Sequence, residues 1–402
     1  MRGSGRSRPC RAPRSGDRIN SPAASSAPRD AAGGRNTARP ERTTPSKAPV
    51  PVGRTGRAVP TRHHRHREDP MTYSVSSAAR SAAATAGPGR VLLASPRGYC
   101  AGADRAVVTV EKALDRYGPP VYVRQQTVRN AHVVRALERR GAVFVGAADE
   151  VPEGAVLVVP EHGTAFEARA EAARRGLTTV DASCPRTTKV PMEARRFARE
   201  GYDILLIGRE GHEEVLGALG EAPDRVHLVG GPDDVPYLRV ADEGRVVWLS
   251  QTTLSVDETA VTVHALKARF PAVLGPPGDD ICYAARNRQA TVRRLAGVCD
   301  LVLVIGSRKS AAAARLAETA VLAGVPAAHL VDCAEEIDPA WLRGMSTVGL
   351  TSGASVPEIL VAEALDRLAA YGFDDVEVIR AEGGGPEWGP AAVAWWEDGR
   401  GF

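Results

Sequence analysis

Several patterns that would assign a chain to a common class of protein are missing from this sequence. The 402 residues contain no CxxC pair, which argues against a zinc ribbon or a zinc finger. No apolar run approaches the roughly 18 residues that a membrane-spanning helix needs. No GxGxxG fingerprint follows the first predicted strand, so a directly bound nicotinamide is not expected.

Cysteine is scarce, and its six positions are widely spaced. They are Cys10, Cys100, Cys184, Cys282, Cys299 and Cys333. In a long chain without the pattern of a secreted protein, such spacing argues against a disulfide framework. Cys299 and Cys333 lie within apolar runs, and we predict that both are core residues.

The positive charge is concentrated near the N-terminus. The net charge is +4, but residues 1–90 hold 18 Lys and Arg against 5 Asp and Glu, so the remainder is acidic. This Arg-, Pro- and Ser-rich segment has few large apolar residues, and we predict a disordered extension over residues 1–89. Nucleic-acid binding is the sharper interpretation of such a tail, but an inert tail, or a gene-model extension ahead of Met71, is preferred. The segment also lacks the apolar core of a secretory signal, which makes the cytoplasm the expected location.

From residue 90 onward, short β-branched runs alternate with amphipathic helical stretches. This alternation predicts an α/β fold with mainly parallel sheets covered by helices. The run Leu301–Ile305 is apolar throughout, as expected of a parallel strand that is buried on both faces. The expected strands are 91–94, 121–123, 143–145, 156–159, 179–181, 204–207, 246–249, 301–305, 328–331 and 347–350.

A loose repeat suggests how the foldable chain is divided. Three times a segment ends in a cysteine that a helical stretch follows, at Cys100, Cys184 and Cys282, which are 84 and 98 residues apart. The repeat predicts three small α/β units, over residues 90–184, 185–281 and 282–380, and a tail over residues 381–402. Ligands of open α/β sheets lie beyond the carboxyl ends of the strands, so the three thiols are hypothesised to converge.

The chemistry of these three cysteines has two interpretations. Each is predicted to lie at a strand-to-helix junction, where the helix N–H groups and dipole stabilise a thiolate. Three converging thiolates suit an iron–sulfur cluster with one iron that has no protein ligand and acts as a Lewis acid. The alternative is three buried structural cysteines, and spacing alone does not exclude it.

Polar residues follow four of the predicted strands, at 161–163, 211–215, 251–255 and 353–355. In α/β proteins such loops carry binding and catalytic residues. Histidine and hydroxyl side chains beside glycine and a helix N-terminus form a plausible diphosphate cradle. Glu214 is a candidate proton donor if burial raises its pKa. For any one of these residues, a helix cap or a surface histidine is the simpler interpretation.

These segments resemble the 4-hydroxy-3-methylbut-2-enyl diphosphate reductase (IspH/LytB) family. The matching strings run in the family's order over about residues 90–380: SPRGYCAGADRA, EHGTA, DASCPRTTKV, GREGHEEVLGALG, SQTTLSVDET, GDDICYAARNRQ and TSGASVPE. The resemblance implies three similar small α/β domains with mainly parallel sheets around a central cavity that contains a [4Fe-4S] cluster, to which each domain contributes one cysteine. It also implies reductive loss of an allylic hydroxyl as water, with two electrons from a ferredoxin or flavodoxin, to form isopentenyl and dimethylallyl diphosphate in the last step of the methylerythritol phosphate pathway.

The resemblance also implies roles for individual residues. The cluster ligands are Cys100, Cys184 and Cys282. The catalytic residues are Glu214 as proton relay, Thr252, which orients the hydroxyl, and His212. The residues that match substrate-binding positions are Arg129, His162, His212, Thr252, Asn287, Ser310 and Ser355.

The sequence departs from the family pattern in the half of the site expected to bind diphosphate. Arg129 replaces the histidine of a VHN motif, and it offers a fixed positive fork but no transferable proton at neutral pH. Three alanines replace hydrogen-bonding residues, and two further positions lose a histidine. These five positions are Ala285, Ala311, Ala312, Pro191 and Arg209.

Two alternatives to the pathway enzyme follow from these departures. A divergent paralogue would keep the iron–sulfur chemistry but reduce a different allylic alcohol or anion. A non-catalytic cluster protein that senses redox state or oxygen is less well supported, because Glu214, Thr252 and His212 are retained. A second copy in the same genome with the usual VHN and SSN strings would favour the paralogue.

Overall fold

The computed structural model describes residues 72–74, 89–125, 129–159, 166–278 and 280–380. The predicted tail over 381–402 and most of the predicted extension over 1–89 lie outside these ranges. In the described part of the chain, no helix combines the length and the apolar character needed to cross a membrane.

The strands form three sheets that are parallel except at one edge, which confirms the predicted α/β fold class. The largest sheet has six strands in the order β1-β11-β10-β12-β2-β13. Its strands in chain order are β1 (Thr72–Ser74), β2 (Gly89–Ser95), β10 (Leu301–Ile305), β11 (Ala327–Val331), β12 (Thr347–Ser352) and β13 (Phe373–Arg380).

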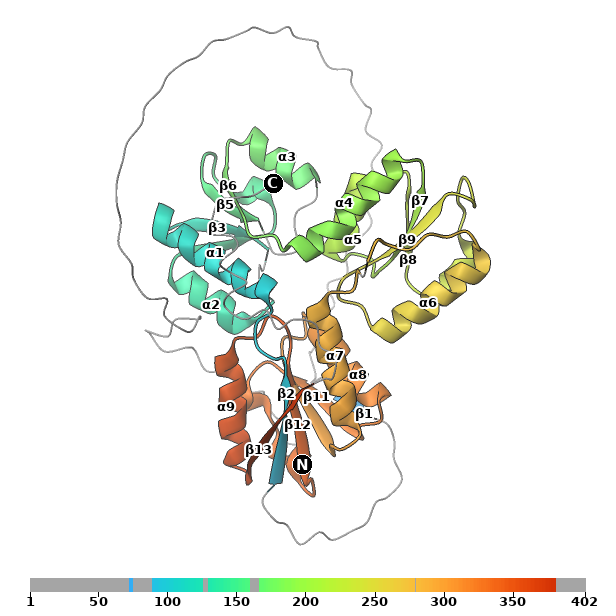
Figure 1. The fold of residues 1–402 in the computed structure, drawn as a ribbon. Coiled ribbons are helices and arrows are strands. Elements are labelled where there is room, and N and C mark those ends of the chain that lie inside the picture. Colours follow the sequence, from blue (N-terminus) through green and yellow to red (C-terminus); the bar gives the residue numbers. More distant parts are fainter. Residues whose placement is uncertain (1–71, 75–88, 126–128, 160–165, 279, 381–402) are drawn as a thin grey trace, which may run out of the picture. The chain divides into compact units, whose positions relative to one another are not determined.

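Helices cover both faces of this sheet (Figure 1). They are α7 (Tyr283–Ala296), α8 (Ala311–Leu322) and α9 (Glu358–Ala369), with short 3-10 turns at Ala334–Glu336 and Pro339–Leu342. Leu301, Leu303 and Ile305 of β10 pack in a core with α9, whereas Val302 and Val304 pack in a core with α7 and α8. The side chains of β10 therefore alternate between two buried faces, as its uninterrupted apolar run predicts.

The four-stranded sheet has the order β4-β3-β5-β6. Its strands are β3 (Val121–Arg124), β4 (Ala142–Val145), β5 (Val156–Val159) and β6 (Thr178–Asp181). Its accompanying helices are α1 (Ala101–Tyr117), α2 (Ala131–Arg139) and α3 (Phe166–Arg174), with a 3-10 turn at Ala148–Glu150. Apolar residues of α1 and α2 form one buried core with β3.

The three-stranded sheet has the order β8-β7-β9. Its strands are β7 (Asp203–Ile207), β8 (Val226–Val229) and β9 (Val246–Ser250). Its helices are α4 (Pro185–Arg199), α5 (Glu213–Glu221) and α6 (Val256–Arg269), with a 3-10 segment at Pro232–Tyr237. The two faces of β7 are buried in separate cores, one with α4 and α5 and the other with α6.

Two segments differ from the sequence-based expectation. Thr72–Ser74 lies within the extension predicted to be disordered, yet it forms β1 and pairs antiparallel with β11, so that part of the prediction is wrong. The physical reason is that β11 would otherwise leave one edge of the sheet unpaired. The sheet membership of β2 also departs from the predicted division, because β2 of the segment 90–184 pairs with β12 and β13 of the segment 282–380.

The chain passes from one sheet to the next at the three cysteine segments. Residues 96–100 lead from β2 of the six-stranded sheet to α1, and residues 182–184 lead from β6 to α4. The segment between α6 and α7, which carries Cys282, returns the chain to the six-stranded sheet. The connections between the sheets therefore contain the three cysteines Cys100, Cys184 and Cys282.

Candidate functional site

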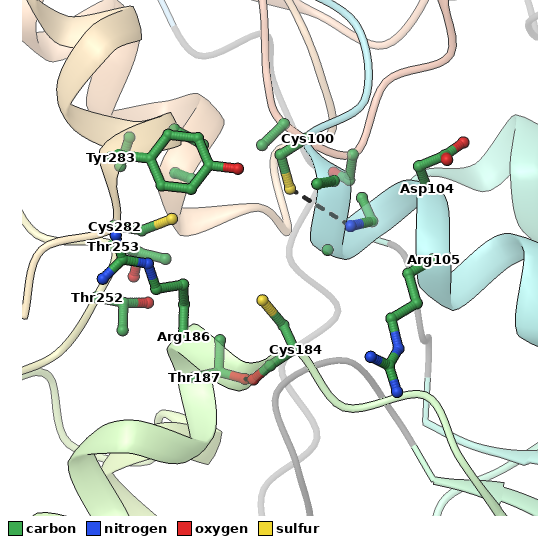
Figure 2. A pocket seen from close by; sticks show the side chains of 18 of the residues that line it. Cys100, Asp104, Arg105, Cys184, Arg186, Thr187, Thr252, Thr253, Cys282 and Tyr283 are labelled. Carbon is green, nitrogen blue, oxygen red and sulfur yellow. Dashed lines mark hydrogen bonds between the residues drawn. The ribbon is translucent and has the colours of Figure 1, made fainter. Parts of the chain in front are cut away.

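The three cysteine segments line one cavity of about 590 Å³. Figure 2 shows the sulfur atoms of Cys100, Cys184 and Cys282 turned toward the same space, with Thr252 beside them. All three cysteines are half-buried. The structure thus brings together three residues that lie 84 and 98 positions apart in the chain.

Each of these cysteines is the residue that precedes a helix. Cys100 is the N-cap of α1, Cys184 of α4 and Cys282 of α7. The Cys100 sulfur accepts a hydrogen bond from the Ala103 N–H at 3.3 Å. The prediction that a helix follows each cysteine is therefore confirmed at all three positions. Helix N-termini stabilise thiolates.

The prediction that a strand precedes each cysteine is wrong at Cys282. In the described residues between α6 and α7 there is no strand, only an isolated bridge between Leu274 and Val247. This segment contains Pro271, Pro276 and Pro277, which have no N–H to donate to a ladder.

Hydrogen bonds from other parts of the fold position the cysteine backbones. The Cys100 N–H donates to the Ala354 carbonyl and the Cys282 N–H donates to the Thr252 carbonyl, each at 2.9 Å. Gly98 has a positive φ of 70°, which favours glycine. The loop before Cys100 therefore depends on a residue without a side chain.

An ion pair joins the second and third cysteine segments. Lys189, on the helix that begins after Cys184, donates to the Asp280 carboxylate at 2.5 Å. The other carboxylate oxygen of Asp280 accepts the Ser250 N–H at 2.9 Å. Burial raises the pKa of Asp280, and the bonds from Lys189 and Ser250 lower it in part.

Tyr283, in the first turn of α7, lines the same cavity as the three cysteines (Figure 2). Burial raises the pKa of its hydroxyl to about 12, and the negative charges of Cys100, Cys282 and Cys184 contribute in that order. Its hydroxyl therefore keeps its proton at neutral pH. The Arg186 guanidinium lies 5.5 Å from the centre of the Tyr283 ring, a distance at which a cation and an aromatic face attract each other.

Thr252 is held against the cavity wall by Glu214. The Thr252 hydroxyl donates to one Glu214 oxygen and the Thr252 N–H donates to the other, each at 2.8 Å. Glu214 is 1% exposed and lies behind Thr252, which lines the cavity. The geometry can therefore pass a proton between a buried carboxyl group and the cavity through a single hydroxyl.

Basic and hydroxyl groups also line the cavity near the start of α8. One Arg129 guanidinium nitrogen donates to the Lys309 carbonyl at 3.1 Å, beside Ser310. Ser310 is the N-cap of α8, and its Oγ accepts the Ala313 N–H at 3.3 Å. Ser355 also lines the cavity. A guanidinium and a helix N-terminus together form an environment suited to an anion.

Of three further residues expected in the site, two are not among the residues that line the cavity in the described part of the chain. His212 is the N-cap of α5, and its Nδ1 accepts the Glu214 N–H at 3.3 Å, so among the described residues it supports Glu214 rather than lining the cavity. Asn287 lies on α7, and it is not among the described residues that line the cavity. His162 lies outside the described residues.

The departures from the family pattern divide into two groups. Arg129, Ala285 and Ala312 line the cavity, whereas Ala311 is the first residue of α8. Pro191 lies inside α4, and the exposed Arg209 lies on the loop after β7 and donates its N–H to the Gln251 side chain at 3.0 Å.

Cys299 and Cys333 are 6% and 2% exposed, which confirms that both are core residues. Burial raises the pKa of Cys299 to about 12. The Cys299 side chain therefore remains a neutral thiol within an apolar core.

Several lining residues were not identified from the sequence. Asp104, Arg105, Thr109 and Lys112 face the cavity from α1, and Arg186, Tyr283 and Arg288 follow the second and third cysteines. The spacing of three and four residues between Arg105, Thr109 and Lys112 places them on one face of a helix, and this signal would have found them.

Among the described residues, no three His, Cys, Asp or Glu side chains form a group that could hold one ion. Thiolates around one zinc ion lie about 4 Å apart, because each Zn–S bond is about 2.3 Å long. A centre with several irons separates its thiolate ligands more widely.

Comparisons with known proteins agree on one family. A family model described as LytB protein matches residues 91–369. A Mycolicibacterium paratuberculosis protein named 4-hydroxy-3-methylbut-2-enyl diphosphate reductase is 62% identical over 290 residues, which cover 72% of this chain and 87% of that protein. A Streptomyces avermitilis protein with the same name is 60% identical over 292 residues, covering 73% and 86%.

A solved structure has the same fold. The E-1-hydroxy-2-methyl-but-2-enyl-4-diphosphate reductase from Plasmodium falciparum has a TM-score of 0.72 and 33% sequence identity to this chain. The match covers 78% of this chain and 99% of the Plasmodium chain.

Proposed function

This chain belongs to the LytB protein family, and we propose that it reduces 4-hydroxy-3-methylbut-2-enyl diphosphate to isopentenyl and dimethylallyl diphosphate. The proposal assigns it an iron–sulfur-dependent reductive dehydroxylation, the last step of the methylerythritol phosphate pathway. The observation that carries the proposal is the convergence of Cys100, Cys184 and Cys282 on a cavity whose wall includes Thr252.

The three cysteines fit a [4Fe-4S] cluster as its protein ligands. Three thiolates at helix N-termini are the donor type that such clusters require. The three sulfurs also belong to three independent segments, which suits a centre broader than one ion. When bound, the cluster supplies electrons to the substrate and an iron position that is open to it.

Thr252 and Glu214 are proposed to deliver protons to the leaving hydroxyl. Glu214 accepts two hydrogen bonds from Thr252, which fixes the threonine hydroxyl between the carboxylate and the cavity. Thr252 touches the substrate in this assignment, and Glu214 acts through it. His212 supports the arrangement by accepting the Glu214 N–H, in addition to its match to a diphosphate-binding position.

The diphosphate is proposed to bind near the start of α8. Arg129 and Ser310 lie side by side there, and the first N–H groups of α8 add a partial positive charge. Ser355 lines the same cavity. His162 and Asn287 remain assigned to the substrate by their motifs alone. Arg129 is proposed to offset the loss of hydrogen-bonding side chains at Ala285, Ala311 and Ala312.

The reaction also needs a source of electrons, and we propose a ferredoxin or flavodoxin as that partner. The cytoplasm is the proposed location, and no nucleic-acid or membrane partner is required. Identities of about 60% to named reductases support the pathway substrate over a divergent paralogue or a redox sensor.

The proposal is tested by anaerobic reconstitution of the full chain with iron and sulfide. We expect a coloured protein that converts the hydroxylated C5 diphosphate to both products with a chemical reductant. Glu214→Gln removes the acidic proton and should lower turnover by about 10²- to 10⁴-fold while iron content and cluster absorbance stay unchanged.

The matched control is Glu210→Gln, which changes an exposed carboxylate on the loop before α5 and should leave turnover within about twofold. A colourless, iron-free protein after anaerobic preparation would refute the cluster assignment. Full turnover by Glu214→Gln would refute the proton relay alone, because the cluster and the substrate would both still be in place.

A further inference from the structure

Arg288 is a buried cation beside two of the proposed cluster ligands. It lies six residues after Cys282 on α7, is 3% exposed, and borders the same cavity as Cys100 and Cys282. The reaction as proposed assigns no role to this side chain. A guanidinium in such a position requires a physical explanation, because a buried charge is costly unless an opposite charge compensates it.

In the described part of the chain, the hydrogen-bond acceptors of Arg288 are neutral. One terminal nitrogen donates to the Gly98 carbonyl at 2.7 Å, and the other donates to the Ala284 carbonyl at 3.1 Å. Gly98 lies two residues before Cys100, and Ala284 lies two residues after Cys282. The side chain therefore joins the first and third cysteine segments. Its Nε is buried and has no hydrogen-bond partner.

Cys100 and Cys282 line the same cavity as Arg288 and offer it negative charge as thiolates. Burial lowers the pKa of Arg288, while Cys100, Cys282 and Tyr283 raise it in that order. An arginine side chain stays protonated in proteins. In the described part of the chain, no carboxylate forms an ion pair with it.

We propose that Arg288 is a positioning residue that ties the Cys100 and Cys282 segments together and whose buried charge favours the reduced state of the cluster between them. This inference rests on the proposed function, since it requires a cluster at the three cysteines. Reduction adds one electron from an external donor, makes or breaks no bond, and increases the negative charge of the cluster with its thiolates by one. A fixed cation in a poorly solvated site stabilises the more negative state and so raises the reduction potential.

Three variants of the full chain separate charge from geometry. Arg288→Gln keeps an amide donor but removes the charge, and Arg288→Lys keeps the charge but loses the planar fork. Arg293→Met is the matched control, because Arg293 lies on the same helix and pairs with the exposed Asp257 at 2.5 Å. Each protein is reconstituted anaerobically, its iron and sulfide are measured, and its cluster is titrated with dithionite while the reduced state is followed by electron paramagnetic resonance.

We expect all proteins to hold the cluster, with a more negative midpoint potential for Arg288→Gln than for the wild type, Arg288→Lys and Arg293→Met. Loss of the cluster from Arg288→Gln but not from Arg288→Lys would also support the role of the charge. Equal potentials for the wild type and Arg288→Gln would overturn the inference, as would loss of the cluster from both Arg288 variants. Absence of iron from the wild type would refute the proposed function itself, so the two failures are distinguishable.

Discussion

Thr252 and Glu214 illustrate how single residues create the chemistry of this cavity. The carboxylate is 38 positions from the threonine in sequence, yet it accepts both the hydroxyl and the N–H of that residue at 2.8 Å. With its proton donated to Glu214, the Thr252 oxygen presents its lone pairs elsewhere, and the residue lines the cavity. A buried carboxylate that is satisfied in this way orients the hydroxyl without touching the substrate.

Arg129 is the residue on which the altered diphosphate half-site depends. Arg129→Ala should raise the KM for the diphosphate substrate by about 10- to 100-fold, because it removes a charged hydrogen bond of about 1.5–3 kcal/mol. The kcat should change little, because the diphosphate does not change charge during the reaction. Steady-state kinetics under anaerobic conditions measure both constants.

The matched control is Arg139→Ala, which removes an exposed arginine from the end of α2 and should leave KM unchanged. Arg129→His tests whether the side chain found in the family restores part of the affinity. A fall in kcat at an unchanged KM would contradict the assignment and place Arg129 with the reacting hydroxyl.

Among the elements, α8 has both a structural and a binding role at its first turn. Its N-cap Ser310 accepts the Ala313 N–H through Oγ, which leaves the hydroxyl proton able to reach an anion in the cavity. Ser255 caps α6 in the same manner by accepting the Glu258 N–H at 3.4 Å, and it does not line the cavity. A comparison of the two serines therefore distinguishes the effect of a helix cap on stability from an effect on substrate binding.

Ser310→Ala and Ser255→Ala should each lower the free energy of unfolding by about 1 kcal/mol, because each removes a helix cap. Only Ser310→Ala should also raise the KM for the diphosphate, by about tenfold. Urea unfolding of the apoproteins and kinetics of the reconstituted proteins measure the two effects. Similar KM values for both variants would show that Ser310 is only a cap.

Across the whole molecule, buried interactions connect the cysteine segments. In the Lys189–Asp280 ion pair the Asp280 side chain is 0% exposed. Lys189→Met should lower the free energy of unfolding by about 3–5 kcal/mol, since it leaves a buried carboxylate without its cation. Thermal and urea unfolding of the apoprotein measure the loss.

The comparison variant for this ion pair is Arg195→Met on the same helix. Arg195 lies 3.6 Å from Glu221 with its side chain 45% exposed, and a solvent-screened pair of this kind contributes about 0–1 kcal/mol. If Lys189→Met were no less stable than Arg195→Met, the Lys189–Asp280 pair would not be the fastening between the second and third cysteine segments.

Elements with a strong apolar signal could be predicted from sequence, and those without it could not. The expected strand 301–305 matches β10 at both ends, because an uninterrupted apolar run marks a strand buried on two faces. β8 was missed because His227 interrupts its apolar run. β13 was missed because most of its residues are exposed, so charged side chains obscure the strand pattern at this edge of the sheet.

The residues of the site likewise divide into those that local sequence predicts and those that it does not. Motifs in the chain were sufficient to select Cys100, Cys184, Cys282, Glu214 and Thr252, because each lies in a short string whose residue types reflect its chemistry. The helix N-caps at the three cysteines also follow from local sequence, because capping involves residues only a few positions apart.

Which residues face one another depends on the folded chain. The bond from Arg288 to Gly98 spans 190 positions, and the Lys189–Asp280 pair spans 91, distances at which no local periodicity carries information. The same applies to the path of the chain after β2. The strand β2 belongs to the six-stranded sheet, whereas α1, which follows it in the chain, accompanies the four-stranded sheet. Local sequence specifies helices, strands and caps because these depend on neighbouring residues, whereas the cavity exists only because packing three sheets and their helices brings distant segments into contact.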